Sequence, residues 1–275
     1  MNLSAYLDRI GFKGRPVLDR STLEAVQRLH LLAIPYENLD VQLARPLTTS
    51  PAAAFDKLVT RRRGGWCYEM NGVLGWALAE IGFRVTRLTG AVMRSAAGDA
   101  SIGNHLILRI DLEDGSWVAD VGLGDGPFTP YPMIEGPFTD RDLDFRLERI
   151  EGGWWRLHNH ALARPPNFDL HLELEDETLL SRKCAILQTD PASLFVQNLI
   201  CQQFTPDGHV DLIGRVLRRY GPEGTSEQIL QSAAELVETL GDVFGLDEPA
   251  AARLWPRICA RHEMVFGQAR PRNAS

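Results

Sequence analysis

The sequence predicts an α+β protein made of three consecutive segments. Residues 1–83 carry apolar residues at helical spacing, with glycine or proline at the expected helix ends. Residues 84–187 contain short runs in which apolar and polar residues alternate, as in antiparallel strands. Residues 188–275 combine both patterns. We therefore expect a helical bundle, a sheet that curls or closes on itself, and a mixed α/β segment.

The composition limits the classes of function. The chain has 275 residues, of which 44% are hydrophobic, enough for more than one core. A net charge of -7 argues against a general nucleic-acid-binding surface. Because no run approaches the roughly 20 apolar residues that span a bilayer, and no signal peptide is evident, we expect a cytoplasmic protein without membrane contact. The four cysteines are scattered without a CxxC pair, which predicts neither disulfides nor a metal site.

Four helices are expected in the first segment. The second should open at Ser21, where Glu24 completes a capping box, and should end before Pro35. The third should begin at Ser50-Pro51, a cap followed by a first-turn proline. The first and fourth are expected over residues 2–10 and 67–81, each followed by a glycine.

The second segment is expected to consist of short antiparallel strands. The dipeptide Asp114-Gly115 is a hairpin-turn signal between two of them. The runs that predict strands are RVTRLTGAVM, LILRIDL, SWVADVGL, FRLERI, WWRLHNH and FDLHLELED.

The third segment mixes helix and turn signals. A helix start is expected after Asp190-Pro191, and a hairpin around residues 206–208. Thr225 with Gln228 predicts the capping box of a longer helix that ends at Gly241. The remaining expectations are a short helix over 249–255, stopped by proline, and a frayed tail from residue 268.

Cys67 is the centre of the candidate site. It follows the flexible Gly64-Gly65 pair and begins the fourth predicted helix. Unpaired backbone N–H groups at a helix N-terminus favour a thiolate over a thiol. A lone cysteine at such a position is more often a small buried apolar residue, so its assignment as a nucleophile requires a base elsewhere in the chain.

His105 and Asp120 are the candidate partners of Cys67. His105 stands where a coil enters an apolar strand, and Asp120 lies inside the apolar run WVADVGLG, where a carboxylate needs a hydrogen-bond donor. Together the three residues supply a nucleophile, a base and a group that orients the base.

The predicted hairpin places a geometric condition on this triad. A two-residue turn at Asp114-Gly115 would set Asp120 opposite Arg109, four residues from His105, and side chains that far apart do not meet. The triad therefore requires a bulge, a longer loop or a departure of His105 from the ladder.

The other histidines give weaker signals. His158 and His160, at i and i+2, are expected on one face of a strand, a geometry that can hold a metal. No cysteine or carboxylate pair accompanies them, so we expect no metal site.

Around these residues the sequence resembles the arylamine N-acetyltransferases. The resemblance rests on RGGWCYEMN around Cys67, NHLILRI around His105, ADVGLG around Asp120 and IPYENLD at residues 34–40, and extends over nearly the whole chain. It implies a helical bundle, a β-barrel and an α/β lid around a core like that of cysteine proteases. It also implies acetyl-CoA as donor and an arylamine or arylhydrazine as acceptor, with a monomer and a homodimer both left open.

The mechanism expected from both lines of reasoning is ping-pong acetyl transfer. Cys67, held as a thiolate by His105, would attack the thioester carbonyl while nearby backbone N–H groups stabilise the oxyanion. The acceptor nitrogen would then attack the acetyl-cysteine, with His105 taking the amine proton and Asp120 fixing the ring.

The resemblance also suggests residues that contact the substrates. An apolar slot suits flat, weakly basic aromatic amines, and the family positions that would line it are Tyr36, Val92, Leu123 and Phe195. Leu123 and Tyr36 each stand where the family usually has phenylalanine.

Coenzyme contacts are expected on both sides of the strand hairpin. The turn 122–126 offers backbone donors near the site, and the residues we expect to contact the coenzyme are Gly103, Asn104, Gly124 and Gly126. Asn104 replaces the threonine that often precedes the family's histidine. Glu37 and Arg63 are expected to form a buried ion pair behind the cysteine, as the matching family residues do.

Two other functions stay open on the sequence alone. A cysteine hydrolase, such as a thiol protease or a transglutaminase-like enzyme, uses a similar order of cysteine, histidine and acid. It would use water, whereas a transferase must exclude water from the acetyl-cysteine. A non-catalytic binding or scaffold protein of the same fold would carry an unreactive Cys67.

Overall fold

The computed structural model describes residues 1–266 and divides into two compact units. The first unit comprises Met1–Tyr36 and Thr48–Ala185, and the second comprises Glu37–Leu47 and the chain from Ile186 onward. Most of the predicted helical and β-rich segments thus belong to one unit. The division into 1–83, 84–187 and 188–275 stays a prediction, and the predicted frayed tail lies outside the described residues.

The helices of the first unit begin and end largely at their sequence signals. Asn2 caps the first helix, and Gly11 and Gly82, both left-handed, follow the first and fourth predicted helices. The helical elements are α1 (Leu3–Ile10), α2 (Arg20–Ala33), α4 (Pro51–Phe55), the π-helical η1 (Asp56–Thr60), α5 (Cys67–Ile81), α6 (Arg94–Ala97), η2 (Gly98–Ser101) and η3 (Glu151–Gly153).

The predicted capping box of α2 is wrong. The N-cap is Asp19, whose carboxylate accepts the Thr22 N–H at 2.7 Å, so the helix begins before Ser21. Glu24 instead pairs with Arg20 at 2.7 Å, one helical turn away.

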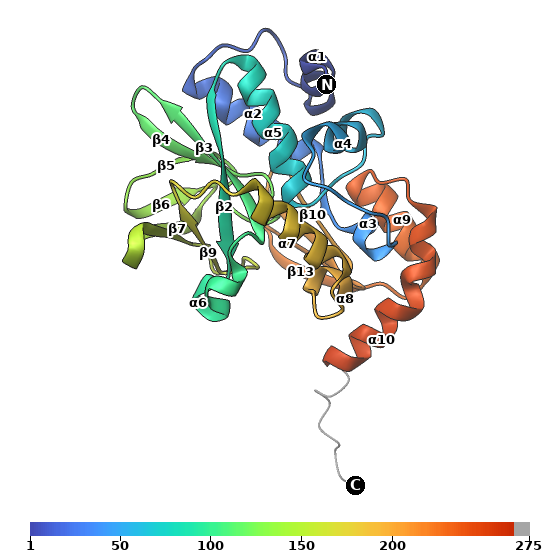
Figure 1. The fold of residues 1–275 in the computed structure, drawn as a ribbon. Coiled ribbons are helices and arrows are strands. Elements are labelled where there is room, and N and C mark those ends of the chain that lie inside the picture. Colours follow the sequence, from blue (N-terminus) through green and yellow to red (C-terminus); the bar gives the residue numbers. More distant parts are fainter. Residues whose placement is uncertain (267–275) are drawn as a thin grey trace. The chain divides into compact units, whose positions relative to one another are not determined.

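An eight-stranded antiparallel sheet forms the rest of the first unit (Figure 1). Its order is β5-β4-β3-β2-β9-β8-β7-β6, which is two meanders that meet where β2 pairs with β9. The strands are β2 (Arg84–Val92), β3 (His105–Leu112), β4 (Gly115–Ala119), β5 (Tyr131–Pro132), β6 (Gly136–Asp140), β7 (Leu143–Arg149), β8 (Trp154–His158) and β9 (Asn167–His171).

The sheet curls without becoming a fully hydrogen-bonded barrel. Its two edge strands, β5 and β6, are separated in sequence by residues 133–135 alone, so curling brings the edges toward each other. Tyr131 of β5 stacks on Phe138 of β6, with ring centroids 5.2 Å apart. The ladders of residues 1–266 nevertheless leave these two strands unpaired with each other, so the predicted barrel is a curled, open sheet.

The inner face of the sheet holds an apolar core, and α5 packs against β2 and β3. Gly75 allows this approach, because a Cβ there would lie 3.0 Å from the side chain of Leu108. The buried core residues include Leu88, Ile107, Val118, Leu123, Tyr131, Phe145, Leu157 and Phe168. The packing brings α5, which begins with Cys67, onto the strand that begins with His105.

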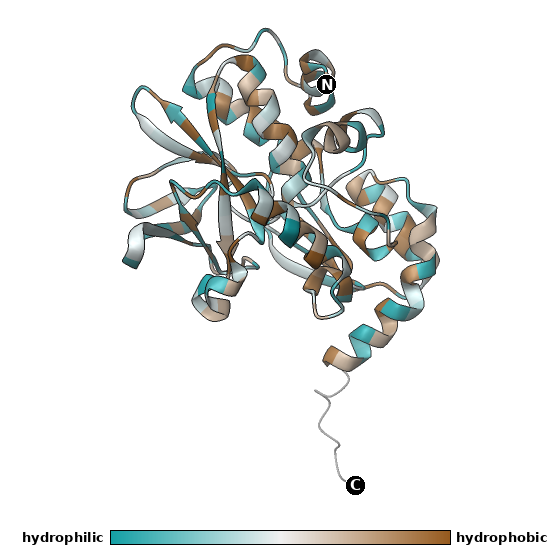
Figure 2. Ribbon diagram, viewed as in Figure 1, coloured by the Kyte–Doolittle hydropathy of each residue, from teal (hydrophilic) through white to brown (hydrophobic). Residues whose placement is uncertain are grey.

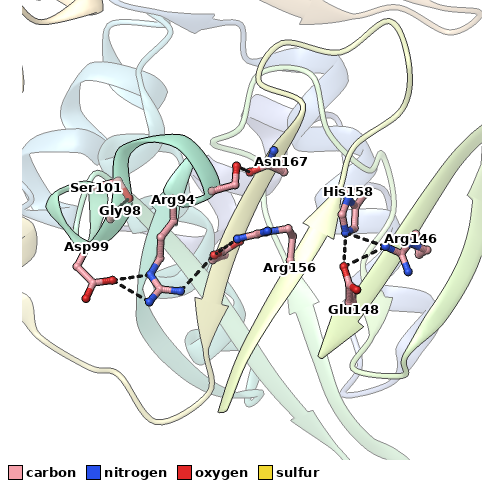
Figure 3. A network of polar contacts seen from close by, with 11 residues as sticks. Arg94, Gly98, Asp99, Ser101, Arg146, Glu148, Arg156, His158 and Asn167 are labelled. Atoms are coloured by element: carbon pink, nitrogen blue, oxygen red, sulfur yellow. Dashed lines mark hydrogen bonds and ion pairs between the residues drawn. The ribbon is translucent and has the colours of Figure 1, made fainter. Parts of the chain in front are cut away.

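Asp169 ties the two meanders together where β2 meets β9. Arg156 of β8 binds its carboxylate through two hydrogen bonds, at 2.7 and 2.8 Å, and Arg94 of α6 reaches it at 3.4 Å (Figure 3). Asp169 is fully buried, so its charge is balanced by arginines that keep contact with solvent. Arg94 also pairs with Asp99, which anchors the excursion between β2 and β3 to the sheet.

A second sheet has the order β1-β10-β11-β12-β13, and its strands β10 to β13, all in the second unit, pair antiparallel. The unit boundary falls inside β1 (Tyr36–Glu37), and the other strands are β10 (Ile200–Phe204), β11 (His209–Ile213), β12 (Val216–Gly221) and β13 (Gly224–Ile229). The helical elements are α3 (Leu39–Gln42), α8 (Leu194–Gln197), α9 (Ala233–Phe244), η4 (Pro249–Leu254) and α10 (Trp255–Phe266). A further helix, α7 (Glu177–Thr189), runs across the unit boundary and was not predicted.

The predicted hairpin around residues 206–208 is confirmed, but the helix assignments after it need correction. Thr225 and Gln228 lie in strand β13, paired with β12, and the helix begins only after the N-cap Ser232. Gly241 lies inside α9, which ends at Gly245 in a left-handed conformation.

The short helix expected over 249–255 is present as the 3-10 helix η4, but the proline after it does not end the helical chain. The proline at position 256 occupies the first turn of α10, where its missing N–H costs no hydrogen bond. The helix continues to residue 266, with polar and apolar residues following each other along it (Figure 2). Every helix within residues 1–266 is too short or too polar to cross a membrane.

Candidate active site

Cys67 lies at the N-terminus of α5, as predicted, and is 2% exposed. Its sulfur is 3.9 Å from the carbonyl oxygen of Asn104, just before β3. Glu69, in the first turn, accepts the Trp66 N–H at 3.3 Å and pairs with Lys57 at 2.9 Å. The start of the helix is therefore fixed by a buried ion pair in its first turn.

His105 and Asp120 meet in the structure. The imidazole Nε2 is 2.7 Å from the carboxylate Oδ2, and both residues are at most 5% exposed. Burial lowers the pKa of His105, but the charge and hydrogen bond of Asp120, with those of Cys67, outweigh burial and raise the pKa to about 10. The imidazole thus lies between a carboxylate and the thiol and is stabilised in its protonated form.

The hairpin register removes the geometric difficulty. The ladder pairs Leu112 with Gly115, so the turn lies one residue earlier than predicted. Continuing this register brings Asp120 level with Ile107, two residues from His105 instead of four. Because β4 ends one residue before Asp120, its carboxylate can turn toward the imidazole without a bulge.

Asn71 is a site residue that the sequence reasoning missed. Its Nδ2 donates to Asp120 Oδ1 at 2.7 Å and to the Leu106 carbonyl at 2.6 Å, and its Oδ1 accepts the Val121 N–H at 2.9 Å. The signal available in the sequence was a polar residue four positions after Cys67, on the same face of the predicted helix, and the structure shows that it is fully buried.

Gly122 connects the acid to the nucleophile. Its N–H donates to Asp120 Oδ1 at 2.7 Å. A Cβ at this position would lie 2.6 Å from Cys67 Cα and 2.7 Å from the side chain of Asn71. Glycine is required here because the two backbones approach each other closely.

Two further side chains hold the segment that follows β4, and both were missed from sequence. Gln27 of α2, 1% exposed, accepts the Asp120 N–H at 3.1 Å and donates to the Pro127 carbonyl at 3.4 Å. His160 lies 3.0 Å from Asp125, and both are almost fully buried. A polar residue on the buried stripe of an amphipathic helix was the available signal for Gln27.

The predicted pocket residues lie in different places. Leu123 and Val92 belong to the same apolar core on the inner face of the curled sheet. The ring of Phe168, in this core, lies 5.6 Å from the His105 ring, centroid to centroid. Tyr36 is buried in the first unit and forms a parallel bridge with Gly65. Phe195 lies on α8 in the second unit.

The residues predicted to bind the coenzyme have structural contacts of their own. The Asn104 side chain bonds both the N–H and the carbonyl of Val92, at 2.7 and 3.1 Å. The Gly103 carbonyl accepts the Tyr68 hydroxyl at 2.7 Å. Gly124 has a φ of +83°, and a Cβ at Gly126 would lie 2.8 Å from Leu123. Their role toward the coenzyme stays a prediction.

The predicted ion pair of Glu37 and Arg63 also stays a prediction. Both residues are buried, but Glu37 belongs to the second unit and Arg63 to the first. Within its own unit, Glu37 accepts the Leu39 N–H at 2.6 Å.

His158 and His160 do not act together. His158 pairs with Glu148 at 2.6 Å on the outside of the sheet, beside Arg146 (Figure 3), whereas His160 turns to the buried Asp125. The strand ends at His158, which breaks the alternation that the i, i+2 pattern assumed. Within residues 1–266, no group of three or more His, Cys, Asp or Glu side chains is arranged to hold a metal ion.

The geometry of the first unit supplies the parts that acyl transfer through a thiol requires. A cysteine stands at a helix N-terminus, an imidazole with a raised pKa lies beside it, and a carboxylate held from several sides orients the imidazole.

Comparisons with known proteins agree on one family. A family model described as N-acetyltransferase matches residues 19–252. The arylamine N-acetyltransferase of Mycolicibacterium smegmatis is 36% identical, over 90% of this chain and 92% of the relative. Human arylamine N-acetyltransferase 1 is 32% identical, over 90% and 94%.

Solved structures give the same result. The arylamine N-acetyltransferase of Mycobacterium marinum superposes with a TM-score of 0.84 at 32% identity, covering 96% of this chain and 99% of its own. The same enzyme in complex with CoA superposes with a TM-score of 0.84. With similarity of this extent in sequence and in fold, the chain belongs to the arylamine N-acetyltransferase family.

Proposed function

We propose that the protein transfers the acetyl group of acetyl-CoA to arylamines and arylhydrazines through an acetyl-cysteine formed on Cys67. The observation that carries the proposal is the alignment of His105 between Asp120 and Cys67 at the N-terminus of α5. Family membership supports acetyl-CoA as donor, since a relative of similar fold is known in complex with CoA.

In the first half-reaction, the Cys67 thiolate attacks the thioester carbonyl of acetyl-CoA. His105 Nε2 donates to Asp120, which leaves Nδ1 as the nitrogen that takes the thiol proton. The bond between the carbonyl carbon and the coenzyme sulfur breaks, and the coenzyme thiolate leaves with the proton held by His105. Backbone N–H groups in the first turn of α5 stabilise the oxyanion on the way.

In the second half-reaction, the acceptor nitrogen attacks the acetyl carbonyl. The new N–C bond forms as the Cys67 S–C bond breaks, and the amine proton passes to His105. The ring keeps its orientation throughout because Asp120 is itself held by Asn71 and Gly122.

The acceptor is selected by apolar surface. We infer that Val92 and Leu123, with Tyr36 and Phe195, form a slot for a flat aromatic ring, and that Gly103, Asn104, Gly124 and Gly126 contact the coenzyme. We infer also that Glu37 and Arg63 pair behind the cysteine. A cytoplasmic location and a monomeric or homodimeric state stay predictions.

The test is intact-mass measurement of the protein after incubation with acetyl-CoA alone. We expect a stable gain of one acetyl group, lost again when aniline or an aryl hydrazide is added, with the acetylated amine as product. Cys67→Ala should gain nothing, whereas Cys259→Ala, which removes a partly exposed thiol on α10, should gain the group normally.

The outcome also separates transfer from the alternatives. Continuous release of CoA without an acceptor and without a stable adduct would identify a hydrolase. A protein whose Cys67 is never acetylated, although the folded state is intact, would contradict the proposal and favour a non-catalytic role.

A further inference from the structure

The segment from Asp120 to Pro127 has no ladder to hold it. β4 ends at Ala119 and β5 begins at Tyr131, and the residues between 120 and 127 are neither helix nor strand. Asp120 is 5% exposed, so its backbone N–H is not satisfied by bulk water. A buried backbone donor at the end of a strand requires a partner from elsewhere in the fold.

Gln27 supplies that partner from the buried face of α2. Its Oε1 accepts the Asp120 N–H at 3.1 Å, and its Nε2 donates to the Pro127 carbonyl at 3.4 Å. A carboxamide carries the same acceptor and donor as a peptide group. The side chain of Gln27 therefore acts as one rung of a ladder and closes the eight-residue segment.

Other contacts hold the segment at different points. Asn71 binds the Val121 N–H at 2.9 Å, and Asn159 donates to the Asp125 carbonyl at 2.7 Å. Asn71 and Gly122 also fix the Asp120 carboxylate. Gln27 differs from these residues because it binds the backbone N–H of Asp120 itself, across 93 positions of sequence.

We propose that Gln27 is a positioning residue that fixes the backbone of Asp120 and so keeps the carboxylate aligned with His105 Nε2. Its part in catalysis rests on the proposed acetyl transfer, but its effect on the imidazole does not. If Asp120 turns away, the imidazolium of His105 loses the charge and the hydrogen bond that stabilise it.

The test compares the pH dependence of Cys67 alkylation by iodoacetamide in three variants. Gln27→Met keeps the length and burial of the side chain and removes both hydrogen bonds. We expect the alkaline limb of its profile, which reports loss of the His105 proton, to move to lower pH. Acetylation by acetyl-CoA should slow by about tenfold, the effect of one hydrogen bond that orients a reacting group, with little change in the KM for acetyl-CoA.

Gln27→Glu is the conservative variant. In a site this buried the carboxyl group is neutral, and a neutral carboxyl still accepts from Asp120 and donates to Pro127. We expect it to restore the wild-type alkylation profile. Thr22→Val is the matched control, because Thr22 is buried on the same helix and its hydroxyl accepts the Val17 N–H, away from the segment.

The results decide between positioning and general loosening. A wild-type alkylation profile in Gln27→Met, whether or not its Tm falls, would overturn the proposal, as would an equal shift in Thr22→Val. If Gln27→Met does not fold, the proposal would be overturned by a Gln27→Glu profile whose alkaline limb lies at lower pH than that of the wild type. Because alkylation does not use acetyl-CoA, failure of acetylation in the wild type would count against the proposed function alone.

Discussion

At the scale of single residues, the site depends on how closely backbones approach each other. Gly122 lies against the Cα of Cys67 while its N–H holds the Asp120 carboxylate. This glycine therefore sets the distance between Cys67 and Asp120. Side-chain chemistry alone does not give this distance, because the constraint comes from the absence of a Cβ.

We expect Gly122→Ala to slow acetylation of Cys67 by about 100-fold, because the new Cβ would lie 2.6 Å from backbone and force the segment or the helix to shift. The measurement is the single-turnover rate of acetyl-cysteine formation, followed by mass spectrometry. The folded fraction should be checked by near-ultraviolet circular dichroism. A folded variant with the wild-type rate would show that the close approach does not matter for the reaction.

At the scale of elements, replacing a glycine by alanine should stabilise the protein where the glycine lies inside a helix. Gly241 lies in the interior of α9 and is exposed, and a Cβ added there would meet nothing within 4 Å. Glycine inside a helix costs conformational entropy without any compensating contact here.

Gly241→Ala should therefore stabilise the protein by about 0.5–1 kcal/mol, the usual difference in helix propensity. The change in the free energy of unfolding can be measured by urea titration, with circular dichroism at 222 nm reporting helix content. Destabilisation would mean that α9 does not extend through this position, which is where the sequence signals had ended it.

The sequence predicts an element well when its signals are local. The start and end of α5 follow from Cys67 and Gly82, and the hairpin before β11 follows from its turn residues. β13 was mistaken for a helix because Thr225 and Gln228 imitate a capping box, while the pairing with β12 that makes it a strand is tertiary.

The candidate site shows the same limit. Residue type and context singled out Cys67, His105 and Asp120, and the structure brings His105 and Asp120 into contact, but their catalytic roles stay a proposal. Gln27 was missed because its hydrogen bond spans 93 positions, and its place on the buried stripe of α2 does not tell which backbone group it binds. The register of the β3–β4 hairpin was missed by one residue in the turn, which doubled the apparent separation of base and acid.

At the scale of the whole molecule, two buried histidines give stability opposite dependences on pH. His105, with a pKa raised to about 10, contributes stability that is present below pH 6.5 and lost as pH rises through 10. His30 is fully buried against the Tyr6 hydroxyl, and burial, with a smaller effect of Arg9, lowers its pKa to about 3. The unfolded chain takes up a proton here below pH 6.5, so His30 costs stability as pH falls toward 3.

We expect His30→Gln, which cannot be protonated and keeps a partner for the Tyr6 hydroxyl, to lose about 3 kcal/mol less stability than the wild type between pH 7 and pH 4. Urea titrations of both proteins at the two pH values give the comparison. Equal losses in the two proteins would show that His30 is protonated in the folded state at pH 4.

The strand order of the large sheet also has a consequence for how the chain is made. β2 ends at Val92, but its partner β9 begins only at Asn167, after the other three strands of the second meander. At a synthesis rate of ~5–20 residues per second, the edge of β2 that pairs with β9 stays unpaired for roughly 4 to 15 seconds. During that interval the unpaired backbone groups of β2 could form a strand pair with another nascent chain. Arg84 and Arg87 on β2 carry positive charges, which oppose such intermolecular pairing.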